Sequence, residues 1–149
     1  MRCVLQAVIA TVMGACVFTP LAAETPVAFG SPSGRIFRYT SDKAALICLM
    51  FDQNWSEAQL YSLRPDGHGE CNLDQTPAFE LPADGPPRLY KYCHGDVFWP
   101  AEHKFVLPYG YSLQNGEFSC LSEKSGMTCR NRSVHGFSMA RAAYVIHSP

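Results

Sequence analysis

The stretch FSCLSEKSGMTCRN, residues 118–131, carries the clearest structural signal in the sequence. Two short runs typical of β-strands, FSCLS and MTCRN, flank the turn-rich segment EKSG. In such a hairpin Cys120 and Cys129 face each other across the strands, within the reach of a disulfide. The sequence therefore predicts a disulfide-linked β-hairpin near the C-terminus.

Outside the first 23 residues the chain has three further cysteines, Cys48, Cys71 and Cys93. We expect Cys71 to form a disulfide with Cys93, which leaves Cys48 unpaired. Cys48 lies in AALICLMF, residues 44–51, an uninterrupted apolar run typical of a core strand. We expect a buried thiol with a raised pKa and low reactivity, and the alternative is a nucleophile or an intermolecular bridge. The spacing of the cysteines does not fit a structural zinc site.

The rest of the chain consists of short aromatic and β-branched runs separated by turn residues. We expect strands at about residues 34–40, 44–51, 88–93, 104–107, 117–122, 127–131, 136–139 and 143–147. Residues 54–61 favour a turn or two of helix, with Asn54 or Ser56 as the cap. Residues 64–87 are expected to form a loop-rich acidic insertion. The pattern predicts an all-β fold, either a single antiparallel β-sandwich or a small barrel.

The first 23 residues read as a cleavable secretory signal. Arg2 supplies a positive start, residues 3–18 carry no charge, and Ala22 and Ala23 precede the first acidic residue. We expect cleavage after Ala23, which leaves residues 24–149 as one periplasmic or secreted domain without a transmembrane segment. MGAC, residues 13–16, is a poor lipobox, and lipidation of Cys16 is the less favoured alternative.

The formal net charge of the chain is −1, and near neutrality argues against nucleic acid as a partner. Charge is nevertheless uneven along the sequence. Residues 51–102 carry nine acidic side chains against three basic ones, whereas residues 120–149 carry four basic ones against Glu123. Arg130, Arg132 and Arg141 belong to this basic region. Such a split is either neutralised within the fold or exposed to an anionic partner.

Six short motifs occur in order along the chain: SPSGRI at 31–36, LICL at 46–49, LPYG at 107–110, FSC at 118–120, GMTCRN at 126–131 and HGFSMAR at 135–141. With them the sequence resembles a bacterial family of small secreted, cysteine-containing domains of unknown function. The likeness covers residues 29–144. It implies a domain type and no particular chemistry.

The sequence departs from that family at two positions. Members typically read SPSGNI, followed by a cysteine two residues on, whereas this chain has Arg35 and Arg38 at the corresponding places. Across a hairpin that turns at residues 41–43, position 38 would lie opposite Cys48. The resemblance thus implies that loss of the first cysteine has left Cys48 without its partner.

Two groups of residues have the composition of a catalytic or metal site. Ser133 and His135 would share one strand face, and with Asp96 they would imitate a hydrolase triad, but no GxSxG nucleophile elbow is present. His94, Asp96 and His103 have a weak metal-ligand spacing, which a turn at Asp96 explains equally well. We expect no metal and no cofactor, and we expect His135 to hydrogen-bond a neighbouring strand.

The middle of the chain is rich in aromatic residues, among them Tyr90 and Tyr92. Alternation along residues 88–92 places Arg88, Tyr90 and Tyr92 on one face of a strand. These aromatic side chains either fill the core or form an exposed aromatic-basic face that binds glycan, peptide or protein.

We therefore predict an exported, non-enzymatic and monomeric binding module at the cell envelope, with an envelope protein or a glycan as its partner. The alternatives are a small secreted hydrolase that uses His135 or His94, and a proteinaceous inhibitor of an exported enzyme. The expected binding residues are Arg130, Arg132, His135, Arg141, Tyr90 and Tyr92.

Overall fold

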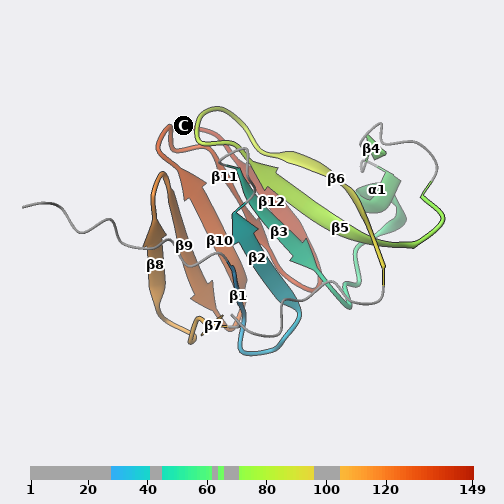
Figure 1. The fold of residues 1–149 in the computed structure, drawn as a ribbon, viewed down its shortest axis with the longest axis horizontal. Coiled ribbons are helices and arrows are strands. Elements are labelled where there is room, and N and C mark those ends of the chain that lie inside the picture. Colours follow the sequence, from blue (N-terminus) through green and yellow to red (C-terminus); the bar gives the residue numbers. More distant parts are fainter. Residues whose placement is uncertain (1–27, 41–44, 62–63, 66–70, 96–104) are drawn as a thin grey trace, which may run out of the picture.

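A computed structural model describes residues 28–40, 45–61, 64–65, 71–95 and 105–149. These residues form twelve strands and one short helix, arranged as two sheets that pack in two layers (Figure 1). No helix in this part of the chain is long and apolar enough to cross a membrane. The expected leader, Cys16, Asp96 and His103 lie outside the described residues.

The larger sheet has seven strands and holds most of the N-terminal half of the domain. Its order is β4 (Arg64–Pro65), β6 (Arg88–His94), β5 (Asp74–Leu81), β3 (Leu46–Met50), β2 (Ile36–Thr40), β1 (Ala28–Gly30) and β7 (Phe105–Val106). The four central pairings are antiparallel, and the outermost pairs, β4–β6 and β1–β7, are parallel.

The smaller sheet is antiparallel throughout. Its order is β12 (Tyr144–His147), β11 (Gly136–Met139), β10 (Gly126–Asn131), β9 (Phe118–Glu123) and β8 (Ser112–Asn115). Cys120 and Cys129 are directly paired on β9 and β10 and form a disulfide, and Cys71 forms a second one with Cys93. Both predicted disulfides are therefore confirmed.

The main core lies between the two sheets. Phe79 of β5 stacks on Phe137 of β11 with ring centroids 4.4 Å apart, and both side chains are fully buried. Trp55 closes one side of this core, where its ring contacts Phe79 and Tyr144 and its Nε1–H donates to the carbonyl of Ala140 at 2.8 Å. Each large apolar side chain that is buried in this way contributes about 1.5 to 3 kcal/mol.

The helix α1 (Glu57–Tyr61) begins after Ser56, one of the two expected caps. The Ser56 hydroxyl accepts the Gln59 amide N–H at 3.3 Å, and Gln59 Oε1 accepts the Ser56 amide N–H at 2.9 Å. This reciprocal arrangement is a capping box, which satisfies amide groups that a helix N-terminus otherwise leaves free.

The predicted sandwich is confirmed, and the alternative of a small barrel is wrong because the sheets stay separate. The prediction of a loop-rich insertion at residues 64–87 is also wrong in its centre. There β5 runs for eight residues between β3 and β6. The strand tolerates Pro77 because β5 pairs with β3 only from Ala78 onward, so the missing amide of Pro77 falls beyond that ladder.

Strand register divides the sandwich into two ends. One end is marked in the larger sheet by Ile36, the first residue of β2, which pairs with Met50. The smaller sheet contributes the β9–β10 turn and the end of β11 to the same end. At the opposite end Leu46 pairs with Leu81, near the β10–β11 turn. The candidate sites described next lie at these two ends.

Candidate functional site

A cavity of about 270 Å³ opens at the first of these ends, and we call it the end pocket. Its walls come from five segments that are far apart in the sequence. These are the loop before β2, the end of β3, the β7–β8 connection, the β9–β10 turn and the β11–β12 connection. Four of the six motifs that define the family resemblance reach it, through Ser31 to Ile36, Tyr109, Gly126 and Ala140 with Arg141.

The loop before β2 is held in a fixed shape by its first serine. The Ser31 amide donates to the Ile36 carbonyl at 2.8 Å, and the Ser31 hydroxyl accepts the Ile36 amide at 3.1 Å. Gly34 has a φ of +71°, which glycine adopts without the strain that a side chain would cause. This turn places Arg35 at the rim of the end pocket.

Asp52 joins two arginines of the end pocket. Its carboxylate accepts from Arg35 Nε at 3.0 Å and lies 3.5 Å from Arg141 Nη2. Arg141 Nε also donates to the Asp52 carbonyl at 3.3 Å. The hydrogen bond from Arg35 and then the charge of Arg141 hold the pKa of Asp52 below its ordinary value. Asp52 therefore fixes both guanidinium groups while remaining exposed itself.

The remaining walls differ in character. Ile36 and Met50 are buried at 5% and 1% exposure and give the pocket an apolar floor, together with Ala140. Lys124 and Glu123 stand at the rim on the β9–β10 turn. Gly126 of the same turn is required by packing, because a Cβ there would lie 2.2 Å from the carbonyl oxygen of Met139.

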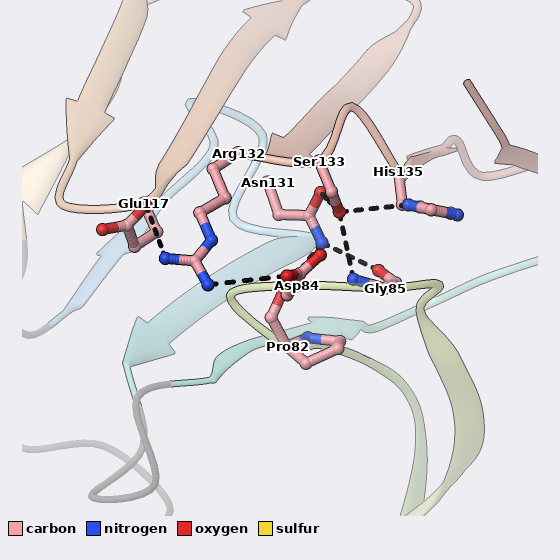
Figure 2. A network of polar contacts seen from close by, with 8 residues as sticks. All are labelled: Pro82, Asp84, Gly85, Glu117, Asn131, Arg132, Ser133 and His135. Carbon is pink, nitrogen blue, oxygen red and sulfur yellow. Dashed lines mark hydrogen bonds and ion pairs between the residues drawn. The ribbon is translucent and has the colours of Figure 1, made fainter.

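The opposite end of the sandwich carries a polar network that links the two sheets (Figure 2). The buried side-chain amide of Asn131 donates to the carbonyls of Pro82 and Gly85 at 2.9 and 2.8 Å. Ser133 accepts the Gly85 amide N–H at 3.0 Å. The β5–β6 turn of one sheet is thereby fixed to the β10–β11 turn of the other.

His135 Nδ1 lies 3.1 Å from Ser133 Oγ, the contact that a serine hydrolase needs between its nucleophile and its base (Figure 2). The Ser133 hydroxyl has a single proton, and Asn131 Oδ1, at 3.0 Å, competes with His135 Nδ1 for it. A hydrogen bond from Ser133 and then the charge of Arg132 also hold the pKa of Asp84 below its ordinary value. Asn131 and Asp84 thus compete with His135 for the Ser133 proton, which weakens the case for His135 as a general base.

The three arginines predicted as one basic patch are divided between the two ends. Arg130 donates to the Val134 carbonyl at 2.9 Å, and Arg132 lies 3.5 Å from Asp84 and 3.9 Å from Glu117. Arg141 lies at the other end, in the end pocket. The structure therefore does not bring these residues together.

Tyr90 and Tyr92 lie on the face of the larger sheet that points away from the main core. They pack, half-buried, against a second apolar cluster that contains Phe37, Ile47 and Leu49. Tyr92 contacts Tyr39 edge-on at 6.4 Å, and burial is the main cause that raises the pKa of Tyr39. These tyrosines therefore neither fill the main core nor stand fully exposed.

His94 is held by hydrogen bonds through both ring nitrogens. Thr76 Oγ1 lies 2.7 Å from Nε2, and the Gly95 carbonyl accepts from Nδ1 at 3.1 Å. Its expected companions, Asp96 and His103, lie outside the described residues. Within the described ranges, no group of three or more histidine, cysteine or acidic side chains is arranged to hold a metal ion.

Cys48 is a free thiol, fully buried in the main core. Burial raises its pKa to about 12, so the thiol is neutral at physiological pH. The residue opposite it is Arg38, as the family departure implied. The apolar side chains of the main core surround this thiol, together with the buried Arg38.

Sequence reasoning missed Arg35, Asp52, Lys124 and Tyr109 as site residues. The available signal was their position: each lies in a turn or at a strand end, where binding residues concentrate. Only the three-dimensional meeting of these turns identifies the site.

A family model described as "Family of unknown function (DUF6636)" matches residues 9–147 of the chain. No curated protein and no solved structure matches it. The match shows a family of unknown function over nearly the whole chain, and it supplies no activity.

Proposed function

The chain belongs to this family of unknown function, DUF6636, and we propose that it is an exported, non-enzymatic domain that binds a small ligand in the end pocket. The observation that carries the proposal is the pocket itself. Five segments meet around an apolar floor whose rim bears Arg35, Lys124 and Arg141. Concave sites with an apolar lining and a few placed polar groups are typical of ligand binding.

Export is supported by the sequence of the first 23 residues and by two disulfides, which persist in oxidising compartments. The test is expression of the full chain with its own leader, followed by intact-mass measurement. We expect a periplasmic or secreted product that begins at Glu24, with one free cysteine. An uncleaved and reduced product in the cytosol would contradict export, and an acylated Cys16 would replace simple secretion with membrane anchoring.

The size of the end pocket limits the ligand. Sites for drug-sized molecules occupy about 300 to 1,000 Å³, and the end pocket is slightly smaller at about 270 Å³. The ligand is therefore a small molecule or the end group of a larger one, which keeps an envelope protein or a glycan as possible partners. The hydrolase alternative loses support because Asn131 and Asp84 compete with His135 for the Ser133 proton, and no particular contact favours an enzyme inhibitor.

Binding in the end pocket is tested by amide NMR spectra of the oxidised mature chain with a library of small fragments. We expect shifts that cluster at Ile36, Gly126 and Ala140. Ala140→Leu places a larger side chain in the pocket and should abolish these shifts, whereas Ala58→Leu, an exposed change on α1, should preserve them. Shifts confined to Tyr90 and Tyr92, or to the Asn131 network, would place binding elsewhere and overturn the proposal.

A further inference from the structure

The end pocket combines two chemistries in one small space. Ile36 and Met50, both nearly fully buried, offer an apolar floor, while Arg35 and Arg141 stand at the rim with side chains 44% and 51% exposed. A ligand that fills this space places an apolar group below and a charged or polar group above. A ligand that is charged throughout would lose its hydration on the apolar floor without gaining hydrogen bonds there. A purely apolar ligand would cover the guanidinium groups without pairing with them, which also costs free energy.

The charge of the rim favours an anion. Three cationic side chains line the pocket, Arg35, Lys124 and Arg141, against Glu123 in the lining and Asp52 beside it. The sum is 3 − 2 = +1. A single negative charge on the ligand therefore balances the site, whereas a cation would add to an existing excess of positive charge.

The arginines retain donors for such an anion although Asp52 holds them. A guanidinium has five N–H donors. Arg35 uses Nε on Asp52, and neither of its terminal nitrogens has a hydrogen bond to another described residue. Asp52 thus holds the two groups and leaves the terminal N–H donors of Arg35 for a carboxylate, which arginine can bind through two hydrogen bonds. Lys124, on a separate turn, forms no ion pair within the described chain and adds a third cation.

We infer that the end pocket binds a monocarboxylate that carries a small apolar group, such as the C-terminal apolar residue of a peptide or a short free acid. This inference rests on the proposed function and names the ligand class for the same pocket. The carboxylate lies at the rim between the arginines and Lys124. The apolar group lies on Ile36 and Met50.

The test is a titration of the oxidised mature chain, followed by amide NMR, with four probes. N-acetyl-leucine has both the carboxylate and the apolar group, N-acetyl-leucinamide lacks the charge, acetate lacks the apolar group, and leucine methyl ester carries a positive charge. We expect binding of N-acetyl-leucine at least tenfold tighter than that of the other three. Binding should weaken as salt is added, because the rim charges are exposed.

Two matched variants locate the charge. Lys124→Gln should weaken binding of N-acetyl-leucine severalfold, and it removes no contact that supports the fold. Lys91→Gln changes an exposed lysine on β6 outside the pocket and should leave binding unchanged. Arg35→Gln should weaken binding further, with amide spectra that confirm the fold.

The outcomes separate this inference from the proposed function. Equal binding of the acid and the amide, or tighter binding of the ester, at the end pocket would overturn the inference and leave the proposed function standing. No shift at the pocket with any probe or fragment would overturn both. Comparison of hexanoate with a tripeptide that ends in leucine distinguishes the two sources, since the tighter of the two identifies free acid or peptide terminus.

Discussion

Arg38 and Cys48 are directly paired across β2 and β3, and both side chains are buried in the sandwich, at 1% and 0% exposure. The Arg38 guanidinium lies 4.7 Å from the ring centroid of Phe29, and none of its three nitrogens has a hydrogen-bond partner among the described residues. A buried cation normally requires ion pairing and hydrogen bonds. Burial accordingly lowers the pKa of Arg38, and Cys48 offers a neutral thiol opposite.

We predict that Arg38→Cys closes a third disulfide with Cys48. The two positions are paired as Cys120 and Cys129 are, whose Cα atoms lie 4.1 Å apart in an existing disulfide. A disulfide that closes a loop of this size stabilises a fold by about 2 to 4 kcal/mol. Alkylation and mass mapping should find no free thiol in the oxidised variant, and urea unfolding should shift to higher concentration.

The double variant Arg38→Cys with Cys48→Ala is the control for that bridge. It also loses the buried cation but cannot form the new disulfide. Reduction breaks the two native disulfides in every variant, so only Arg38→Cys should lose more stability on reduction than wild type does. A single variant with two free thiols after oxidation would contradict the pairing of β2 with β3.

Arg38→Met is predicted to stabilise the protein. Replacement of buried ionic groups by apolar side chains of similar volume often stabilises a protein by about 1 to 4 kcal/mol. Urea unfolding of the oxidised mature chain measures the effect. Arg88→Met, at an exposed position, should change stability by no more than about 0.5 kcal/mol. A clear loss of stability in Arg38→Met would show that the guanidinium has a favourable partner in solution.

The contribution of Asp52 to stability is predicted to depend on pH. Its pKa is lower in the folded chain than the ordinary 3.8, so the ionised group stabilises the fold above that value. This stabilisation is lost as the pH falls through the folded pKa. Melting curves should therefore show Asp52→Asn less stable than wild type near neutral pH, with a difference that closes in acid. Asp74→Asn, at an exposed carboxylate, should show no comparable difference in stability from wild type. A difference for Asp52→Asn that grows as the pH falls would contradict the prediction.

Asn131→Ala is predicted to destabilise the link between the sheets. The change leaves the half-buried carbonyls of Pro82 and Gly85 without their donor, and a buried polar group left unsatisfied costs about 1 to 3 kcal/mol. We expect a loss of about 2 to 4 kcal/mol in urea unfolding. Arg132→Ala, which removes only exposed ion pairs of the same network, should cost no more than about 1 kcal/mol. Equal losses for the two variants would contradict this division.

The predicted strands with the clearest sequence signal are those with full alternation or an uninterrupted apolar run. The β9 pattern alternates fully between buried and exposed side chains, and β3 is buried along its whole length. In contrast, β5 begins with two exposed polar residues and contains Pro77, and its neighbours β3 and β6 supply the pairing that makes it a strand. Such tertiary pairing leaves little trace in local composition.

The site was harder to predict than the fold, for a related reason. Ser133 and His135 are neighbours in the sequence and attracted attention together, but Asn131 and the β5–β6 turn determine what their side chains do. Arg35, Asp52 and Arg141 are separated by up to 106 positions and meet only through the stacking of two sheets. Spacing along the chain therefore directed attention to the end that holds Ser133 and His135, whereas the end pocket lies at the other end.

Each disulfide lies on one side of the sandwich: Cys120–Cys129 joins two strands of the smaller sheet, and Cys71–Cys93 joins β6 to the segment before β5. A pulling force on the two ends of the chain can therefore part the layers without breaking a covalent bond. The residues between the bridged cysteines, with sequence separations of 22 and 9, cannot extend while the disulfides are intact. The oxidised chain would then reach roughly 100 Å less far than the reduced one, so that oxidation limits how far the domain can be stretched.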